Sequence, residues 1–174
     1  MILMMLLASA GATASLPVCA PNQLSLGFDA EGGTFSGMQQ SGALLVIRNM
    51  GPGACTVPAL PTLIFKDAKG RPLPVIRKAP AYMHPGQAVA PAGIADGAEV
   101  TATLRWVSGP AFDHSRCFTS ASASISLGGE TLGTDISASF CAPQGGRATF
   151  DQPPLRPDPP LHPPGPAAPK APPG

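Results

Sequence analysis

The chain has 174 residues, including 23 Pro and 20 Gly, while only 12% of the residues are charged and 5% are aromatic. A charged fraction of about half the usual quarter argues against a coiled coil or a helix-rich enzyme. Eleven basic and ten acidic residues give a net charge of +1. This charge is too small to attract nucleic acid or an anionic membrane electrostatically. We therefore expect no nucleic-acid partner, and one domain of roughly 100 to 150 residues with tails.

The first 14 residues are typical of an export signal. An apolar run at residues 2–8 leads into small residues that end in Ala12-Thr13-Ala14, which matches the apolar core and the A-x-A step of a signal peptide. We predict cleavage after Ala14, with Ala10 as the second choice. Small and polar residues interrupt the run before it reaches the roughly 20 apolar residues of a membrane-spanning helix. We therefore expect no span after cleavage, and a mature protein in the periplasm or outside the cell.

Residues 15–150 are predicted to form one domain of short strands. Runs that are typical of strands occupy residues 24–28, 43–49, 62–66, 72–78, 99–107, 121–127 and 131–140. The runs recur at a spacing of roughly 8 to 12 residues and are separated by glycine or proline, which is the pattern of an all-β sandwich. Pro72 and Pro74 cannot donate ladder hydrogen bonds, so the run that contains them is predicted to be an edge strand. Apolar and polar residues alternate most clearly at residues 99–107, which places Trp106 in the core.

Four cysteines in a small exported chain predict two disulfides, for which three pairings are possible. Cys117 and Cys141 flank two strand-like runs that meet at Gly128-Gly129. A hairpin that turns on this pair would place the two thiols opposite each other. Cys19 then pairs with Cys55, and both thiols lie at one end of the sheet if the strands at 24–28 and 43–49 are antiparallel neighbours. The cysteines lack the C-x-x-C spacing of a zinc site.

Residues 151–174 are predicted to form a disordered, proline-rich tail. The last 23 residues hold 11 of the 23 prolines and few apolar side chains, a composition that favours a polyproline-II-biased extension over a packed one. Such a tail could serve as a spacer or as a ligand for an aromatic groove, but a solvated tail is the simpler interpretation.

No catalytic set converges in the sequence. Asp113-His114-Ser115 contains the residue types of a triad, but neighbours in an extended chain point to opposite faces. The serines between Ser120 and Ser126 are spaced by two and are interpreted as the solvent face of a strand. We therefore predict a protein without enzymatic activity and without a cofactor.

Copper binding is the alternative that the residues leave open. Met83-His84 supplies a thioether and an imidazole, which Met38 or His114 could complete. A histidine that precedes Pro85-Gly86 is more simply a residue of a surface turn. The five basic residues between Lys66 and Lys78 could bind an anion, or they could protect edge strands from aggregation.

Several residues together resemble a known family. They are Asn49-x-Gly51-x-x-x-Cys55-x-Val57, Pro61, the turn at 67–70, His84-Pro85-Gly86, Leu104-Arg105-Trp106, Cys117 and Cys141. This order resembles the exported domain-of-unknown-function family 4232 over about residues 19–141. The resemblance implies a bacterial cell-envelope protein with an immunoglobulin-like antiparallel β-sandwich, and it implies no established activity. The family's Gly-Tyr before the proline is replaced here by Ala59-Leu60.

These observations predict a disulfide-linked β-sandwich that acts as a binding or structural module of the cell envelope. Asn49 is predicted to be structural, because its side chain can bond to the backbone across the Gly51 turn. The partner is an unidentified envelope protein or ligand, and we expect the protein to be a monomer.

Overall fold

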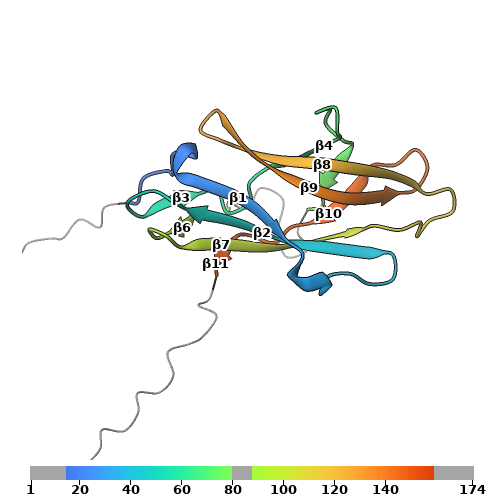
Figure 1. Ribbon diagram of the computed structural model, residues 1–174, viewed down its shortest axis with the longest axis horizontal. Helices are drawn as coiled ribbons and strands as arrows, with labels where there is room; N and C mark the ends of the chain where they lie inside the picture. The colour runs from blue at the N-terminus through green and yellow to red at the C-terminus, as the bar shows by residue number, and fades with distance from the viewer. Residues whose placement is uncertain (1–14, 80–87, 159–174) are drawn as a thin grey trace, which may run out of the picture.

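The computed structural model describes residues 15–79 and 88–158 (Figure 1). These residues form eleven strands and two single-turn 3-10 helices, η1 (Pro21–Gln23) and η2 (Glu31–Gly33), and they contain no α-helix. The strands are β1 (Leu24–Asp29), β2 (Gln40–Asn49), β3 (Cys55–Val57), β4 (Leu63–Lys66), β5 (Val75–Arg77), β6 (Ala92–Ile94), β7 (Glu99–Val107), β8 (Arg116–Leu127), β9 (Glu130–Ala142), β10 (Ala148–Asp151) and β11 (Arg156–Pro157). The predicted signal peptide at residues 1–14 lies outside the described residues.

The strands form two main layers, as expected for the predicted all-β fold. One sheet has the order β1-β2-β7-β10-β5, and β11 also pairs with β7. The other sheet has the order β4-β8-β9, and β3 and β6 form a separate pair. Figure 1 shows β8 and β9 as a layer over β1, β2 and β7.

Strand β7 is the centre of the larger sheet and follows the predicted alternation. Val100, Ala102, Leu104 and Trp106 are buried, and the residues between them are half-buried. Strand β2 pairs antiparallel with β7 along nine residues and with β1 on its other side. The prediction that Trp106 belongs to the core is confirmed.

Aromatic rings from both layers meet in the core. Phe65 of β4 lies 4.5 Å from Phe140 of β9 and 5.3 Å from Phe150 of β10, measured between ring centroids. The Trp106 ring packs 5.0 Å from Phe140. Such contacts add to the stabilisation that burial of the rings provides.

Both predicted disulfides are present. Cys19 is bonded to Cys55, with their Cα atoms 4.9 Å apart, and Cys117 is bonded to Cys141, with their Cα atoms 4.0 Å apart. Cys117 and Cys141 are direct partners in the β8–β9 hairpin, as the position of its glycine pair predicts. The Cys117–Cys141 bridge therefore follows from strand pairing, and β1 and β2 are the antiparallel neighbours on which the prediction of the Cys19–Cys55 bridge depended.

One pair of strands departs from the expected antiparallel pattern. Strand β5 is an edge strand, as predicted for residues 72–78, but it begins only at Val75, after Pro72 and Pro74. It runs parallel to β10, with Val75 opposite Ala148. Parallel neighbours need a long connection between them. Here the connection from β5 to β10 includes β7 and the whole β8–β9 hairpin.

The predicted start of the tail at residue 151 is wrong, because the fold continues to Asp158. Gln152 and Leu155 are buried, and the Leu155 N–H donates to the Ala59 carbonyl over 2.7 Å. Strand β11 then pairs with Val100 and Thr101 of β7. Proline removes a donor but keeps its carbonyl, so a proline-rich segment can still line a sheet. Residues 159–174 lie outside the described part of the chain.

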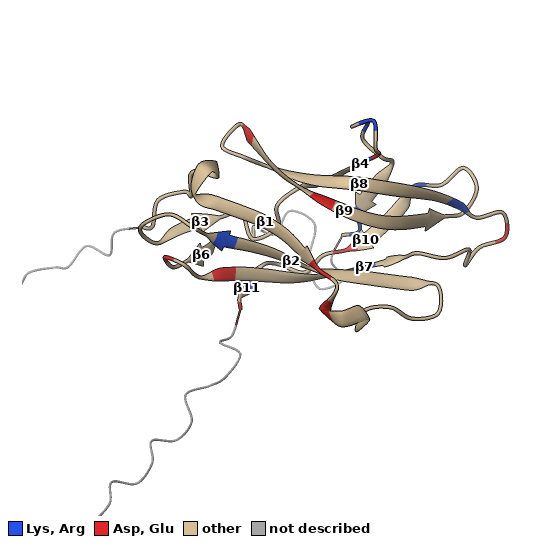
Figure 2. Ribbon diagram, in the orientation of Figure 1, with Lys and Arg blue, Asp and Glu red and all other residues tan. Residues whose placement is uncertain are grey.

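Charged residues are sparse and lie mainly in loops and near strand ends (Figure 2). One ion pair crosses from Arg48 of β2 to Glu99 of β7. Within residues 15–79 and 88–158, no helix has the length and hydropathy that a membrane-spanning helix requires.

Candidate binding cleft

The candidate site is a cleft of about 390 Å³ between the two layers. It opens where β1 ends. The residues that line it are Phe28, Ala30, Ser36, Ser41, Gly42, Ala43, Trp106, Asp135, Ile136, Ser137, Ala138 and Ser139. They come from the end of β1, the loop after it, the start of β2, the end of β7 and the middle of β9. This volume falls within the range of small-molecule sites.

The cleft exists because β1 is shorter than β2. The pairing of β1 with β2 ends at Asp29 and Leu44. There the Glu31 N–H donates to the Asp29 carboxylate over 2.7 Å, and the chain turns away through η2, where Glu31 and Gly32 have positive φ. On the N-terminal side of Leu44, the residues from Ser41 to Ala43 pair with β7 only. The edge of β2 to which β1 pairs is therefore left without a strand partner at these residues.

The floor of the cleft is apolar and its mouth is polar. Ala43, Trp106, Ile136 and Ala138 are all at least nine-tenths buried. The lining residues nearer the surface are mostly hydroxyl-bearing, and Asp135 is the only charged residue among the described lining residues. A few polar groups around an apolar floor are typical of sites that orient a small ligand.

Trp106, which lines the cleft, also has an unsatisfied hydrogen-bond donor. The side chain is 6% exposed, and its indole N–H is buried without an acceptor among the described residues. Most buried polar side-chain atoms in proteins have a partner. Leaving a buried donor unpaired costs about 1–3 kcal/mol. The indole N–H of Trp106 is therefore an unpaired donor inside the fold.

A β-bulge in β9 shapes the opposite wall. Ser120 pairs with Ala138 and Ser122 pairs with Asp135, so that Ile136 and Ser137 together face one residue of β8. The Ser120 hydroxyl donates to the Ile136 carbonyl over 3.0 Å and fixes the irregular segment from the β8 side. Bulges re-aim side chains and occur next to functional sites. Three of the lining residues, Asp135 to Ser137, belong to this segment.

The same irregularity corrects the interpretation of the β8 serines. They were predicted to face solvent, but Ser120 and Ser124 are buried. The register shift turns Ser120 to the inner face. Ser124 is enclosed because β8 is the central strand, with Ile64 of β4 on one side and Gly133 of β9 on the other.

Of the residues of the copper alternative, the structure describes only Met38 and His114. Met83 and His84 lie outside the described residues. Met38 is 97% exposed in the loop before β2, and His114 is exposed in the loop before β8. In the described ranges, no three His, Cys, Asp or Glu side chains are grouped as metal ligands would be.

The loop that contains the triad residue types has a local role. The Ser115 hydroxyl donates to the Phe112 carbonyl over 2.8 Å and accepts from the Phe112 N–H over 3.0 Å. His114 next to it has a positive φ of 56°. The three residues therefore form a turn.

The basic stretch between Lys66 and Lys78 is partly paired. Arg71 forms an ion pair with Asp67, and Lys78 lies 3.6 Å from Asp151. Arg77 donates to the Leu60 carbonyl over 3.2 Å. These three cations already have partners within the domain.

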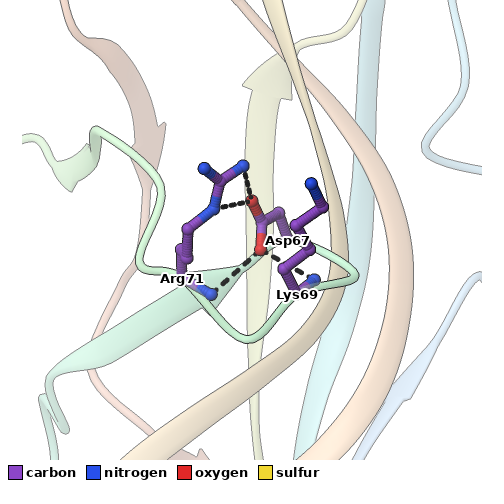
Figure 3. A network of polar contacts seen from close by, with 3 residues as sticks. All are labelled: Asp67, Lys69 and Arg71. Carbon is purple, nitrogen blue, oxygen red and sulfur yellow. Dashed lines mark hydrogen bonds and ion pairs between the residues drawn. The ribbon is translucent and has the colours of Figure 1, made fainter.

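Figure 3 shows the strongest of these pairings, in the turn after β4. The Asp67 carboxylate accepts from the backbone N–H groups of Arg71 and Lys69, each over 2.9 Å, and from the Arg71 side chain over 2.8 Å. The backbone bond from Arg71, followed by its side-chain bond, lowers the pKa of Asp67. The predicted turn from Asp67 to Gly70 is confirmed, and Gly70 has the positive φ of 75° that favours glycine.

Sequence reasoning placed Trp106 correctly but missed the cleft. The sequence shows that the strand at residues 99–107 alternates and that Trp106 carries a hydrogen-bond donor. It does not show that this donor is left without an acceptor among the described residues. The bulge in β9 also lacks a local signal, because Ile136 and Ser137 fit a regular strand equally well.

A comparison with protein families matches residues 19–154 to the family described as "Domain of unknown function (DUF4232)". This match includes all four cysteines, Asn49 and the strands that form the cleft. No curated protein and no solved structure matches the chain. The matched region covers most of the 174 residues, so the chain belongs to the DUF4232 family.

Proposed function

We propose that this protein is a non-enzymatic binding module of the bacterial cell envelope that holds a small ligand in the cleft between β2, β7 and β9. Two disulfides support export, because such bridges persist in oxidising compartments. The signal-like segment at residues 1–14 supports the same location.

The observation that carries this proposal is the cleft of about 390 Å³, in which four serine hydroxyls and the Asp135 carboxylate surround buried apolar side chains. Such polar groups can fix the orientation of a small ligand that the apolar side chains contact. The Trp106 ring, which lines the cleft, is packed against Phe140, so this part of the cleft is positioned before a ligand arrives. Such preorganisation lowers the entropic cost of binding.

The lining residues favour binding over catalysis. The described residues around the cleft include one carboxylate and four serines, but no His, Cys or Lys. A serine nucleophile needs a base within hydrogen-bond reach. We therefore assign the serines to hydrogen bonding with a ligand.

Trp106 also makes the proposal easy to test, because it is the only tryptophan in the chain. We would titrate the domain with a panel of sugars, amino acids, nucleosides and short alcohols, and follow tryptophan fluorescence and ¹H–¹⁵N NMR spectra. We expect at least one compound to shift the indole N–H signal together with the backbone signals of residues 135–139. The proposal fails if the panel leaves these signals unmoved or moves only signals elsewhere in the domain.

A further inference from the structure

We infer that the cleft binds an extended peptide segment, which adds to the open edge of β2 as a short strand. This inference rests on the proposed function and names the chemical class of the ligand. Three observations carry it: the direction of the Gly42 backbone groups, the lack of a partner for them among the described residues, and the position of Gly42 in the lining of the cleft.

The edge of β2 is open over a short stretch between two paired positions. At one end of the stretch, Leu44 pairs with Asp29, the last residue of β1. At the other end, Gln40 forms an antiparallel bridge with Gly37. Figure 1 shows that β2 continues beyond the end of β1. The open stretch of the edge therefore comprises residues 41–43.

The backbone groups of Gly42 point to this open edge. The Gln40 N–H donates to the Gly37 carbonyl over 3.2 Å, and the Gln40 carbonyl accepts from the Gly37 N–H over 3.0 Å. Both groups of Gln40 therefore point away from β7. In an antiparallel sheet, successive residues of a strand direct their two backbone groups alternately to one neighbouring strand and to the other. Gly42 lies two residues further along, so its N–H and its carbonyl point to the same side as those of Gln40.

These two groups of Gly42 have no partner in the described part of the chain. A β1 that continued in register would place Glu31 opposite Gly42, two residues beyond the pair of Asp29 and Leu44. Glu31 instead has a positive φ of 48° in η2, and no hydrogen bond joins the Gly42 backbone to the described loop that follows. Gly42 is nevertheless buried, and buried backbone groups are normally paired. The open edge therefore offers one donor and one acceptor to a ligand.

The cleft gives access to these groups, because the outer face of Gly42 is covered. A Cβ on Gly42 would collide with the Leu104 carbonyl oxygen, and it would lie 2.9 Å from the Phe35 Cβ and 3.0 Å from the Arg105 Cδ. The Arg105 guanidinium lies 5.9 Å from the centroid of the Phe35 ring. Phe35 and Arg105 therefore occupy the outer face, while Gly42 itself lines the cleft.

The pair of free backbone groups selects a peptide. Two opposed residues of an antiparallel ladder exchange both of their N–H···O bonds. The ligand therefore needs an acceptor and a donor with the spacing that the carbonyl and the N–H have in one extended residue. At roughly 3.3 Å per residue, the stretch opposite residues 41–43 holds about three residues of such a chain.

The two faces of β2 predict the side chains of the peptide. Successive side chains of an extended chain point to opposite faces. The residue opposite Gly42 would point to the outer face, where Phe35 and Arg105 leave room for a small side chain only. The residues beside it would point inward, to the face of the buried Ala43, and Ile136 lines the cleft on that side. We therefore expect a small central residue between two apolar ones.

Charges of both signs lie around the site and do not define the ligand. Asp135 lines the cleft, and Asp29 and Glu31 are neighbours of the lining residue Ala30. Arg105 lies on the outer face, against Phe35. Neutral peptides are therefore the appropriate probes, because their binding reports the backbone bonds without a contribution from ion pairs.

We would test this inference by NMR titration of the full chain with capped peptides. The probe is N-acetyl-Ser-Val-Ala-Val-Ser-amide, and the control peptide carries an N-methyl group on its central alanine. This methyl group removes the N–H that would donate to the Gly42 carbonyl. We expect the probe to shift the Gly42 amide proton saturably, together with signals of residues 135–139, and to slow the exchange of the Gly42 amide with solvent. The N-methylated peptide should bind about tenfold more weakly or not at all.

Two variants of the chain test the location of the peptide. Ser137→Phe places a large side chain in the cleft, because Ser137 lines it and is exposed in β9. This variant should bind the probe about tenfold more weakly or not at all. Ser126→Phe is the matched control, because Ser126 is exposed in β8 and does not line the cleft, so it should bind like the parent. Circular dichroism of each variant would separate lost binding from lost folding.

The outcomes distinguish this inference from the proposed function. If a sugar, a nucleoside or an alcohol shifts the cleft signals and the peptide does not, the cleft is a binding site but the peptide inference is overturned. Equal binding of the probe and its N-methylated form, or of the probe to the parent and to Ser137→Phe, also overturns it. A Gly42 signal that moves with protein concentration alone would identify a second copy of the chain as the occupant, against the inference. If no probe shifts the cleft signals, both proposals are overturned.

Discussion

Asn49 holds together the end of the sheet where β2 meets the Gly51 turn. Its side chain is completely buried. The amide nitrogen donates to the Gly53 carbonyl over 2.8 Å, and the amide oxygen accepts from the Gly51 N–H over 3.1 Å and from Gln23 over 3.2 Å. The sequence predicted the bond across the turn but not the contact with Gln23. That contact is long-range, because the two residues are 26 positions apart.

Replacing Asn49 should destabilise the domain strongly. Asn49→Leu keeps a similar volume but leaves buried polar partners unpaired, so we expect a loss of about 2–4 kcal/mol in the free energy of unfolding. Urea denaturation followed by circular dichroism would measure it. Asn22→Ala is the control, because Asn22 is exposed and its loss should fall within about 0.5 kcal/mol. Equal effects of the two changes would contradict the structural role of Asn49.

Asp67 gives a prediction about pH. Its pKa is lowered in the folded state, so its contribution to stability is complete above its unfolded value of about 3.9 and is lost as the pH falls through the folded pKa. The largest cause is the backbone N–H of Arg71, which Arg71→Ala retains. We therefore expect this variant to raise the Asp67 pKa only part of the way to the unfolded value. A ¹³C NMR titration of the carboxyl carbon would show it, and full recovery of the unfolded value would contradict the assignment to the backbone.

At the scale of elements, the strands with clear alternation or clear turns were predictable. Strand β7 and the β8–β9 hairpin follow directly from period-2 patterning and the glycine pair at the turn. The register shift inside the hairpin was not predictable, because it is fixed by the Ser120 hydroxyl bonding across to β9. The cleft depends on this shift and on the early end of β1, so it could not be predicted from any single segment.

Strand β11 was missed because composition dominated the prediction. A proline-rich run normally has too few apolar residues to form part of a core. In this segment, however, Leu155 is only 4% exposed and packs into the hydrophobic core. Its N–H and that of Asp158 both donate to carbonyls of the domain. A few well-placed residues therefore anchor the segment between Gln152 and Asp158.

Truncations should locate the true end of the domain. A chain that ends after Asp151 loses Leu155 and β11, and we expect it to be clearly less stable than the full chain. The single change Leu155→Ala should cost about 2–4 kcal/mol. The control chain ends after Asp158 and keeps every described contact of the segment. Thermal denaturation would rank the three. The assignment of β11 to the domain is wrong if the shortest chain is as stable as the control.

For the whole molecule, the two disulfides differ in protection from solvent. Cys19 and Cys55 are both buried, whereas Cys117 is exposed beside its buried partner. Thiol–disulfide exchange requires access to a sulfur atom. The Cys117–Cys141 bridge should therefore be reduced first.

Limited reduction should reveal this order. Brief treatment with a low concentration of dithiothreitol, followed by alkylation and peptide mass spectrometry, should label Cys117 and Cys141 before Cys19 and Cys55. Complete reduction should lower stability by about 3–4 kcal/mol for each bridge in the loop-entropy treatment. The control is the same reduction and alkylation in urea. There the domain is unfolded, so both cysteine pairs should be labelled at similar rates. Earlier labelling of Cys19 and Cys55 in the native state would contradict the prediction.

The position of β10 and β11 in the larger sheet has a consequence for how the protein is made. Strand β7 pairs with β2 on one side and with β10 and β11 on the other, and Phe150 completes the aromatic core. A polypeptide that emerges amino end first therefore cannot close this sheet until its last described strands have appeared. Folding that depends on such distant pairings is slow and leaves apolar strands open for longer. An unfinished chain therefore exposes apolar strand residues until Phe150 and Leu155, which are buried in the complete domain, have been made.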